Sequence, residues 1–355
     1  MDAGSVRSLV LPQQRIRSGA LPVLFTRRGL VSSALASAAI AAWLLAAAIT
    51  LALPDRLAGS SRFSDTPVGL PDTIQFGIGT AAVAGLIVLL ALGGLVIHAL
   101  GKRLRFSAPW LIVTGSLVAV YELATAKNGW LPSTYFPSPQ EIFSAYPEDG
   151  GLLLQSVGYS MRLVAIGVLI GAVIGFFTGL AMGWSKRANY WLLPVVRTIG
   201  PVPASAWLPL AFVLLPTGFQ ASIFLIALGT WFPVTIQMFN GVASVNRRYY
   251  DIARTLGARD RFLIWKIAVP SSMPSLFLGL FMALGTSFVL LLAAETTGVK
   301  AGLGWYIQWQ QSYMEYNKMW ACLLIMIVLF SSLITLLFRV QAHVLSWQKG
   351  LVHGG

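Results

Sequence analysis

The sequence predicts an all-α protein whose helices cross a membrane about eight times. Of its 355 residues, 56% are hydrophobic and only 10% are charged, whereas soluble domains carry about 25% charged residues. The apolar residues form continuous runs instead of alternating with polar ones, which favours helices over strands. A transmembrane helix needs about 20 mostly apolar residues. The charge-free stretches are 29–54, 73–101, 163–185, 198–246, 267–294 and 319–338.

Two further features bring the expected number of spans to eight. The stretch 198–246 is long enough for two spans joined by a turn at Pro216-Thr217-Gly218, and a further span near 107–126 is interrupted only by Glu122. The first apolar run exceeds the 7–15 residues of a signal-peptide core, so we expect an uncleaved first helix. Residues 1–30 are polar and basic and are predicted to form a disordered cytoplasmic tail.

The net charge of +13 reflects topology and does not indicate a nucleic-acid partner. With both ends placed inside, 18 of the 25 Lys and Arg residues fall on the inner side and 5 on the outer side. This distribution follows the positive-inside rule and predicts cytoplasmic N- and C-termini. The three histidines are isolated and Cys322 lies in an apolar run, so no metal site is predicted and the thiol is expected to be packed.

Aromatic residues mark two expected outer segments. Residues 127–154 contain several prolines and are predicted to form an ordered interfacial strap without a helix. A second aromatic group at 305–320 has approximate helical spacing. It predicts a belt lying flat at the membrane surface, with a docking surface for another protein as the alternative.

Glycine recurs every four residues in the fourth span. This spacing makes a ridge without side chains, along which another helix backbone can approach closely. An unspecialised, flexible glycine-rich helix is the alternative. The glycines are Gly167, Gly171, Gly175, Gly179 and Gly183.

Three residues are candidates for lining a path through the membrane. Pro201 and Pro203 should kink or unwind the fifth span, because proline removes a backbone donor and clashes one turn back. Irregular backbone at membrane depth is tolerated inside protein or beside a water-filled path; an inert kink is the alternative. Glu295 follows a long apolar run. A carboxylate inside the membrane is expected to face a cavity or a partner. The alternative is that Glu295 lies at the outer interface and bonds to the turn at Thr296-Thr297-Gly298.

The inner loop 244–266 is predicted to be structured. Asp251 can cap a helix start, Gly257 fits a left-handed residue at that helix's end, and Asp260 can begin a second amphipathic helix that runs to Pro270. A structured loop with an apolar face should dock onto a partner.

This loop resembles the EAA loop of the permeases of binding-protein-dependent ABC importers. That pattern falls on Asp251, Ile252, Ala253, Gly257, Ile267 and Pro270. Asp251 and Ile252 depart from it, where the family has Glu and Ala. Further pieces are similar to the sulfonate, taurine and nitrate branch of the family: Phe136-Pro137-Ser138-Pro139, the glycine ladder, Pro201-Val202-Pro203, Ala294-Glu295 and Gly302–Ile307.

The resemblance implies a fold like that of type I ABC importer permeases. It implies an inner-membrane transport subunit at 106–350, with 31–105 as an N-terminal addition. A separate ATPase would hold ATP and Mg and contact Asp251, Ala253, Gly257, Ile267 and Pro270. A second permease copy and an extracytoplasmic solute-binding protein would complete the transporter. The chain contains no P-loop motif, so no nucleotide chemistry and no cofactor of its own are expected.

Two other functions are weighed against this one. A secondary transporter driven by an ion gradient would place ionisable groups in several spans and often shows inverted repeats. A membrane-embedded enzyme would need convergent His, Asp or Ser chemistry. For the importer, the resemblance favours a small anion such as a sulfonate, taurine or nitrate, with a heterocyclic vitamin precursor as the alternative.

Overall fold

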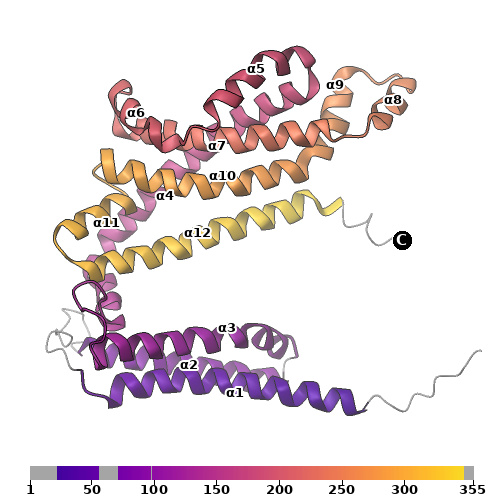
Figure 1. The fold of residues 1–355 in the computed structure, drawn as a ribbon. Coiled ribbons are helices and arrows are strands. Elements are labelled where there is room, and N and C mark those ends of the chain that lie inside the picture. Colours follow the sequence, from indigo (N-terminus) through magenta and orange to yellow (C-terminus); the bar gives the residue numbers. More distant parts are fainter. Residues whose placement is uncertain (1–21, 56–70, 97, 348–355) are drawn as a thin grey trace, which may run out of the picture. The chain divides into compact units, whose positions relative to one another are not determined.

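The computed structural model describes residues 22–55, 71–96 and 98–347, and the regular elements within these ranges are helices (Figure 1). The chain divides into two compact units. The first comprises Met1–Phe63 and Leu70–Trp130, and the second comprises Ser64–Gly69 and Leu131–Gly355. Each is described separately below.

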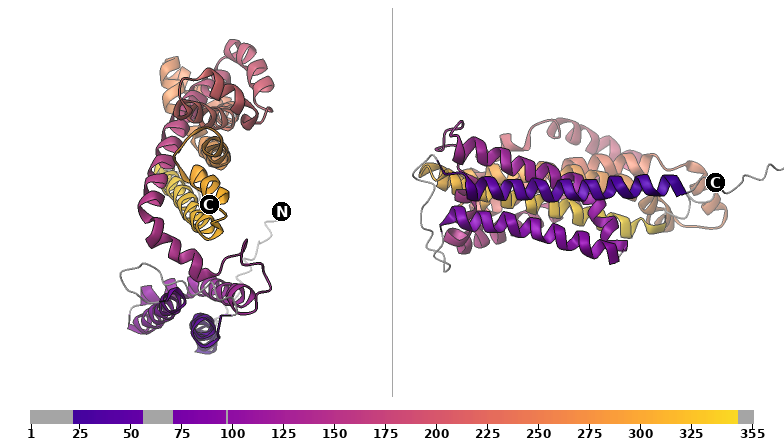
Figure 2. Two further views of the ribbon diagram at one scale, coloured as in Figure 1. Left: turned by 90° about the vertical axis from the view of Figure 1, so that its left-hand side faces the viewer. Right: turned by 90° about the horizontal axis from the view of Figure 1, so that it is seen from below.

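The first unit is a bundle of three helices that run side by side (Figures 1 and 2). They are α1 (Pro22–Ala52), α2 (Asp72–Val96) and α3 (His98–Glu122), which continues into a π-helical turn, η1 (Leu123–Lys127). Ala39, Ile87 and Leu104 form their shared core. The boundary expected near residue 105 falls inside α3, and the compact unit extends to Trp130. Residues 1–21 of the expected tail lie outside the described residues, and 22–30 belong to α1.

A buried lysine ties the end of α1 to the end of α3. Lys127 Nζ donates hydrogen bonds to the carbonyls of Thr50 (3.0 Å) and Leu53 (2.7 Å) and to Asp55 Oδ1 (2.6 Å). Its side chain is 3% exposed, and Glu122 Oε1 lies 3.8 Å from Nζ with no exposed side-chain surface. Lys127 opens the expected outer segment 127–154, and Glu122 interrupts the expected span near 107–126; the structure buries both side chains, and each lies next to an opposite charge.

The second unit contains the remaining helices. In chain order they are α4 (Pro139–Trp184), α5 (Lys186–Ile199), η2 (Ala204–Trp207), α6 (Leu208–Leu214), α7 (Gly218–Ala243), α8 (Arg247–Thr255), α9 (Asp260–Phe262), η3 (Leu263–Ala268), α10 (Val269–Gly298), α11 (Leu303–Ser312) and α12 (Tyr316–Val344). Helix α7 packs against both α4 and α10. Within this unit α8 and α9 lie at one end, and α6 and α11 lie at the other (Figure 1).

The expected strap at 127–154 is wrong in its second half, which is helical. Helix α4 begins at Pro139, where proline is tolerated because the first N–H of a helix needs no partner. Ser138 caps the helix and forms a capping box with Glu141, whose carboxylate accepts from the Ser138 N–H at 2.9 Å. The helix is kinked two residues after Pro147, at Asp149 (φ −110°, ψ 16°).

Seven helices among the described residues are long and apolar enough to cross a membrane. The expected eighth span corresponds to α5, η2 and α6, which are interrupted at residues 200–203 and at 215–217. The prediction of about eight spans therefore agrees with the structure once this broken segment is counted as one crossing.

Candidate functional site

The glycines of α4 form its contact with α7. A Cβ atom added to Gly175 would lie 2.9 Å from the carbonyl oxygen of Trp231, and one added to Gly179 would lie 2.5 Å from that of Thr235. At Gly171 an added Cβ would collide with the carbonyl of Ala227. Gly167 and Gly183 also face α7, where a Cβ atom added to either glycine would meet a side chain. The two backbones thus approach at a separation that a side chain on this ridge would prevent.

Hydroxyl groups link α7 to both of its neighbours. Thr178 on α4 and Thr235 on α7 lie 2.8 Å apart, and Trp231 Nε1 donates to Thr178 Oγ1 at 3.1 Å. On the opposite side, Thr230 and Ser287 lie 2.9 Å apart, which joins α7 to α10. Such hydrogen bonds between membrane helices contribute about 0.6 kcal/mol each on average. Together with the glycine contact, they make α4, α7 and α10 the rigid frame of the unit.

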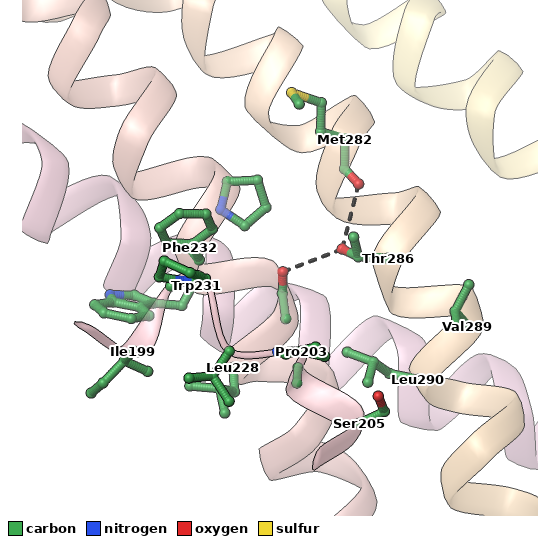
Figure 3. A pocket seen from close by; sticks show the side chains of 16 residues that line it. Ile199, Pro203, Ser205, Leu228, Trp231, Phe232, Met282, Thr286, Val289 and Leu290 are labelled. Atoms are coloured by element: carbon green, nitrogen blue, oxygen red, sulfur yellow. Dashed lines mark hydrogen bonds between the residues drawn. The ribbon is translucent and has the colours of Figure 1, made fainter. Parts of the chain in front are cut away.

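The segment formed by α5, η2 and α6 is interrupted at residues 200–203. This break lines a cavity whose other walls are α7 and α10. Helix α5 ends at Ile199, Val202 N–H donates to the Ile199 carbonyl at 3.1 Å, and Pro203 precedes the short η2 turn. The cavity has a volume of about 440 Å³. Its walls come from the break, from α7 and from α10 (Figure 3), and the residues that line it are Ile199–Ser205, Leu228, Gly229, Trp231, Phe232, Pro233, Met282, Thr286, Val289 and Leu290.

The chemistry of this cavity is apolar with a few neutral polar groups. The lining residues include no ionisable side chain. Thr286 Oγ1 donates across the cavity wall to the Gly229 carbonyl at 3.2 Å and is also 3.0 Å from the carbonyl of Ala283. Ser205 is exposed at the break. A solute here would meet hydroxyls, backbone groups and aromatic rings, and would find no fixed counter-ion.

Pro201 and Pro203 line the cavity, but Glu295 does not. Glu295 is fully buried. Its Oε1 accepts from Ser160 at 2.6 Å, and its Oε2 accepts from the Gly304 N–H at 2.8 Å. The carboxylate thus faces protein on all sides, and it neither lines the cavity nor bonds to the Thr296-Thr297-Gly298 turn.

Glu295 instead shapes the turn between α10 and α11. Gly302 adopts φ +107°, and a Cβ atom there would collide with the Glu295 carboxylate. The Ser160 hydroxyl that donates to Glu295 also accepts from the Leu303 N–H at 2.9 Å. The sequence shows Glu295 as unusual, but no local signal points to Ser160, which lies far away in the chain.

Asp149 joins three helices near the other end of α4, and sequence reasoning did not select it. Its Oδ2 accepts from the Tyr306 hydroxyl at 2.8 Å and from Gln310 Nε2 at 3.0 Å, both on α11. Lys318 Nζ on α12 lies 3.5 Å from the same oxygen. Burial, followed by the contact with Asp149, raises the pKa of Tyr306 above its ordinary value. Asp149 is also the residue at which α4 is kinked.

The aromatic residues near α11 stack on one another. The rings of Trp305 and Trp309 are stacked at 5.2 Å, and Tyr313 meets Trp309 edge-on at 5.8 Å. Trp320 Nε1 donates to the Tyr135 carbonyl at 3.0 Å, which anchors the segment before α4.

The inner loop has the helix and elbow that its sequence predicts, with a different start. Asn246 is the cap of α8, because its side chain accepts from the Arg248 N–H at 3.0 Å; Asp251 lies inside the helix and is exposed. Gly257 has φ +83°, as expected for a left-handed residue after a helix. The Ala258 N–H donates to the Ala253 carbonyl at 3.0 Å and closes the turn.

The second helix of the loop does not stop at Pro270. It runs from Asp260 through η3 into α10 and continues to Gly298. Pro270 lies in the first turn of α10, directly after the π-helical turn η3, and Ile267 is half-buried within that turn. Proline cannot donate to a carbonyl one turn back, and the local change to π-helical bonding accommodates this loss.

Comparison with known proteins agrees with this architecture. The described helices and the cavity define a polytopic membrane transport protein. Residues 167–349 match the family of the binding-protein-dependent transport system inner membrane component. Since that match covers more than half of the chain, the protein belongs to this family and is the membrane-embedded permease component of an ABC importer.

Relatives of this chain include permeases named for sulfonates and for nitrate. The chain is 28% identical over 241 residues to a Bacillus subtilis protein named as the aliphatic sulfonates transport permease SsuC, covering 67% of this chain and 87% of the relative. It is 31% identical over 180 residues to the nitrate import permease NrtB of Synechococcus elongatus, covering 51% and 63% respectively. A chain of the MetNI methionine ABC transporter in an inward-facing conformation aligns with a TM-score of 0.48 at 18% identity, covering 56% of this chain and 98% of that chain.

Proposed function

We propose that two copies of this permease form a pathway for a small anion, such as an alkanesulfonate, taurine or nitrate. A solute-binding protein delivers the anion from outside, and a separate ATPase that holds ATP and Mg drives transport. The observation that carries the proposal is the exposed helix α8, held by the Gly257 elbow at the end of the second unit where α4 and α7 finish.

The outer face of α8 suits a protein partner. Tyr249 is 61% exposed, Ile252 is 60% exposed and Leu256 is 83% exposed. The charged residues of the helix, Arg247, Arg248, Asp251 and Arg254, are also exposed. Exposed apolar side chains among charged ones, on a helix outside the long apolar spans, are typical of a docking surface that a partner covers.

The lining of the cavity, which is apolar with a few neutral polar groups, supports a small anion as the substrate class. Without a fixed cation in its lining, an anion is not held by an ion pair, and a neutral donor such as the Ser205 hydroxyl can replace part of its hydration. Weak binding inside the membrane leaves selectivity to the binding protein. The relatives' names supply the sulfonate and nitrate candidates.

A second copy of the chain is the proposed cover for the broken segment. On α6, Val213 is 80% exposed and Leu214 is 69% exposed, and on α5 the neighbouring Tyr190 and Trp191 are 72% and 74% exposed. These residues lie on the two helices that flank the cavity-lining break. Packing of two such faces would enclose the path between the copies.

We place both termini and α8 in the cytoplasm. Eight crossings, an even number, return the chain to its starting side, and the basic residues favour the inside on that side. A cysteine at exposed Leu256 should react with a membrane-impermeant maleimide only in inverted vesicles, and one at exposed Trp130 only from outside. Reaction at Leu256 from outside would contradict the orientation and the docking of an ATPase on α8.

The direct test is reconstitution of the complex. The tagged permease is co-expressed with the ATP-binding-cassette subunit encoded beside it and purified in mild detergent. Retention of the ATPase is expected, together with uptake of taurine, ethanesulfonate or nitrate, whichever the neighbouring binding protein retains. Uptake that persists without the ATPase, driven by an ion gradient, would overturn the proposal.

A further inference from the structure

Helix α8 has one residue that reaches back into the membrane helices. Seven of its residues are exposed, and Tyr250 and Ala253 are half-buried. The Tyr250 ring meets the Trp184 ring edge-on, with 5.6 Å between centroids and an angle of 78°. It also packs against a buried cluster at the ends of α4, α7 and α10, formed by Leu180, Met238, Val242, Ala268 and Val269.

The contact depends on the ring of Tyr250 and not on its hydroxyl. The hydroxyl oxygen is enclosed, and no residue in the described part of the chain forms a hydrogen bond with it. Burial raises the pKa of Tyr250. An enclosed hydroxyl without a partner costs free energy, so the stabilising contribution of this side chain is the packing of its aromatic face against Trp184 and the cluster.

Helix α7 contributes residues both to this buried cluster and to the wall of the cavity. Helix α7 runs from Gly218 to Ala243 and contains Pro233, which itself lines the cavity. Met238 and Val242, near one end, contact the cluster under Tyr250, while Trp231 and Phe232, farther along, line the cavity. The α4 glycines opposite Met238 and Val242 hold the two helices in close contact. A displacement of α8 that moves Tyr250 therefore has a packed route to the cavity wall.

From this geometry we propose that Tyr250 is a positioning residue that couples movement of α8 to the cavity. The proposal rests on the proposed docking of an ATPase on α8. It assigns the two adjacent tyrosines separate tasks: exposed Tyr249 faces the partner, and Tyr250 connects α8 to Trp184 and α7. Loss of the Tyr250 ring should leave the docking face intact and disconnect it from the cavity.

The experiment measures the state of the cavity without needing the transported solute. Ser205, which is exposed in the cavity lining, is replaced by cysteine; Cys322, the one native cysteine, is buried. The permease and its ATPase are purified as a complex in nanodiscs. The reaction rate of Ser205→Cys with a maleimide is measured with and without a non-hydrolysable ATP analogue. In the parent, nucleotide should change this rate about fivefold or more.

Three variants separate the ring from the hydroxyl. Tyr250→Ala should retain the ATPase and its hydrolysis of ATP, while the reaction rate at position 205 no longer responds to nucleotide. Tyr250→Phe keeps the ring and should respond like the parent. Tyr250→Leu keeps apolar volume without an aromatic face; it gives a reduced response and replaces the alanine variant if that protein does not insert.

The outcomes distinguish the two proposals. If the parent does not retain the ATPase, or position 205 does not respond to nucleotide, the proposed function fails. If the parent responds and Tyr250→Ala responds equally, Tyr250 is not the connection. If Tyr250→Ala loses the ATPase itself, Tyr250 belongs to the docking face and the inference is overturned.

Discussion

Ser160 on α4 and Glu295 on α10 form a buried hydrogen bond of 2.6 Å that fixes the turn into α11. The same Ser160 oxygen accepts from the Leu303 N–H, and the second Glu295 oxygen accepts from the Gly304 N–H. Two side chains therefore satisfy two backbone donors of a buried turn. A carboxylate at this depth is explained by these bonds, without a role in contacting solute.

This arrangement predicts a loss of stability when either side chain is truncated. Ser160→Ala leaves the Leu303 N–H unpaired and should cost about 1–3 kcal/mol. Glu295→Ala should cost more, because it strands Ser160 and Gly304 and leaves a void. Thermal unfolding of the detergent-solubilised protein measures both. Thr297→Ala, at an exposed residue on the same helix, is the control and should change stability by less than about 0.5 kcal/mol. Equal stability of Ser160→Ala and the parent would contradict this account.

The glycine ridge predicts an opposite response at two glycines of one helix. An alanine at Gly171 would collide with the Ala227 carbonyl, so Gly171→Ala should push α4 from α7 and cost about 1–3 kcal/mol. Gly158 lies on the same helix with no atom within 4 Å of an added Cβ. Gly158→Ala should be neutral or stabilising by about 0.5–1 kcal/mol, because glycine is unfavourable inside a helix. Thermal unfolding of the two variants compares them. A similar effect of both substitutions would show that the ridge is not a tight contact.

The break at Pro201 and Pro203 predicts a transport defect without a folding defect. Replacing both prolines by alanine restores backbone donors and lets α5 extend, which narrows the cavity that they line. Uptake into reconstituted vesicles should fall several-fold, while the amount of assembled complex stays unchanged. Pro209 lies in the first turn of α6, where proline costs little, so Pro209→Ala serves as the control. Unchanged uptake in the double variant would make the break incidental to transport.

The sequence predicted the helices and their contacts best where a repeating pattern carried the information. Charge-free runs identify the spans, a four-residue period identifies the glycine ridge, and a glycine after an amphipathic segment identifies the elbow at Gly257. Each of these signals is local. The positive φ at Gly257 could be expected because few other residues adopt it readily.

The failures have local and non-local causes. The expectation of a strap without a helix fails at Pro139, because proline disfavours a helix interior but is tolerated in the first turn, and Ser138 and Glu141 have the spacing of a capping box. Burial of Lys127 beside Asp55, and the pairing of Ser160 with Glu295, join residues distant in the chain. No period or spacing encodes such pairs, so they become visible only after the helices pack.

The elbow at Gly257 gives the most direct prediction, because a substitution there is strained by its backbone conformation alone. An added Cβ at Gly257 meets no atom within 4 Å, so its φ of +83° is the source of strain in a substituted chain. A valine there should cost about 1–2 kcal/mol locally, tilt α8 from its partner and leave the membrane helices folded. Asparagine tolerates this conformation better, so Gly257→Asn should retain most function.

Asp251→Lys reverses the one acidic charge on the exposed face of α8 without disturbing its cap, since Asn246 is the cap. Gly257→Val and Asp251→Lys should both insert normally yet lose the ATPase in a pull-down, or retain it and hydrolyse ATP without uptake. If both variants bind the ATPase and transport like the parent, α8 is not the element that couples ATP hydrolysis to transport.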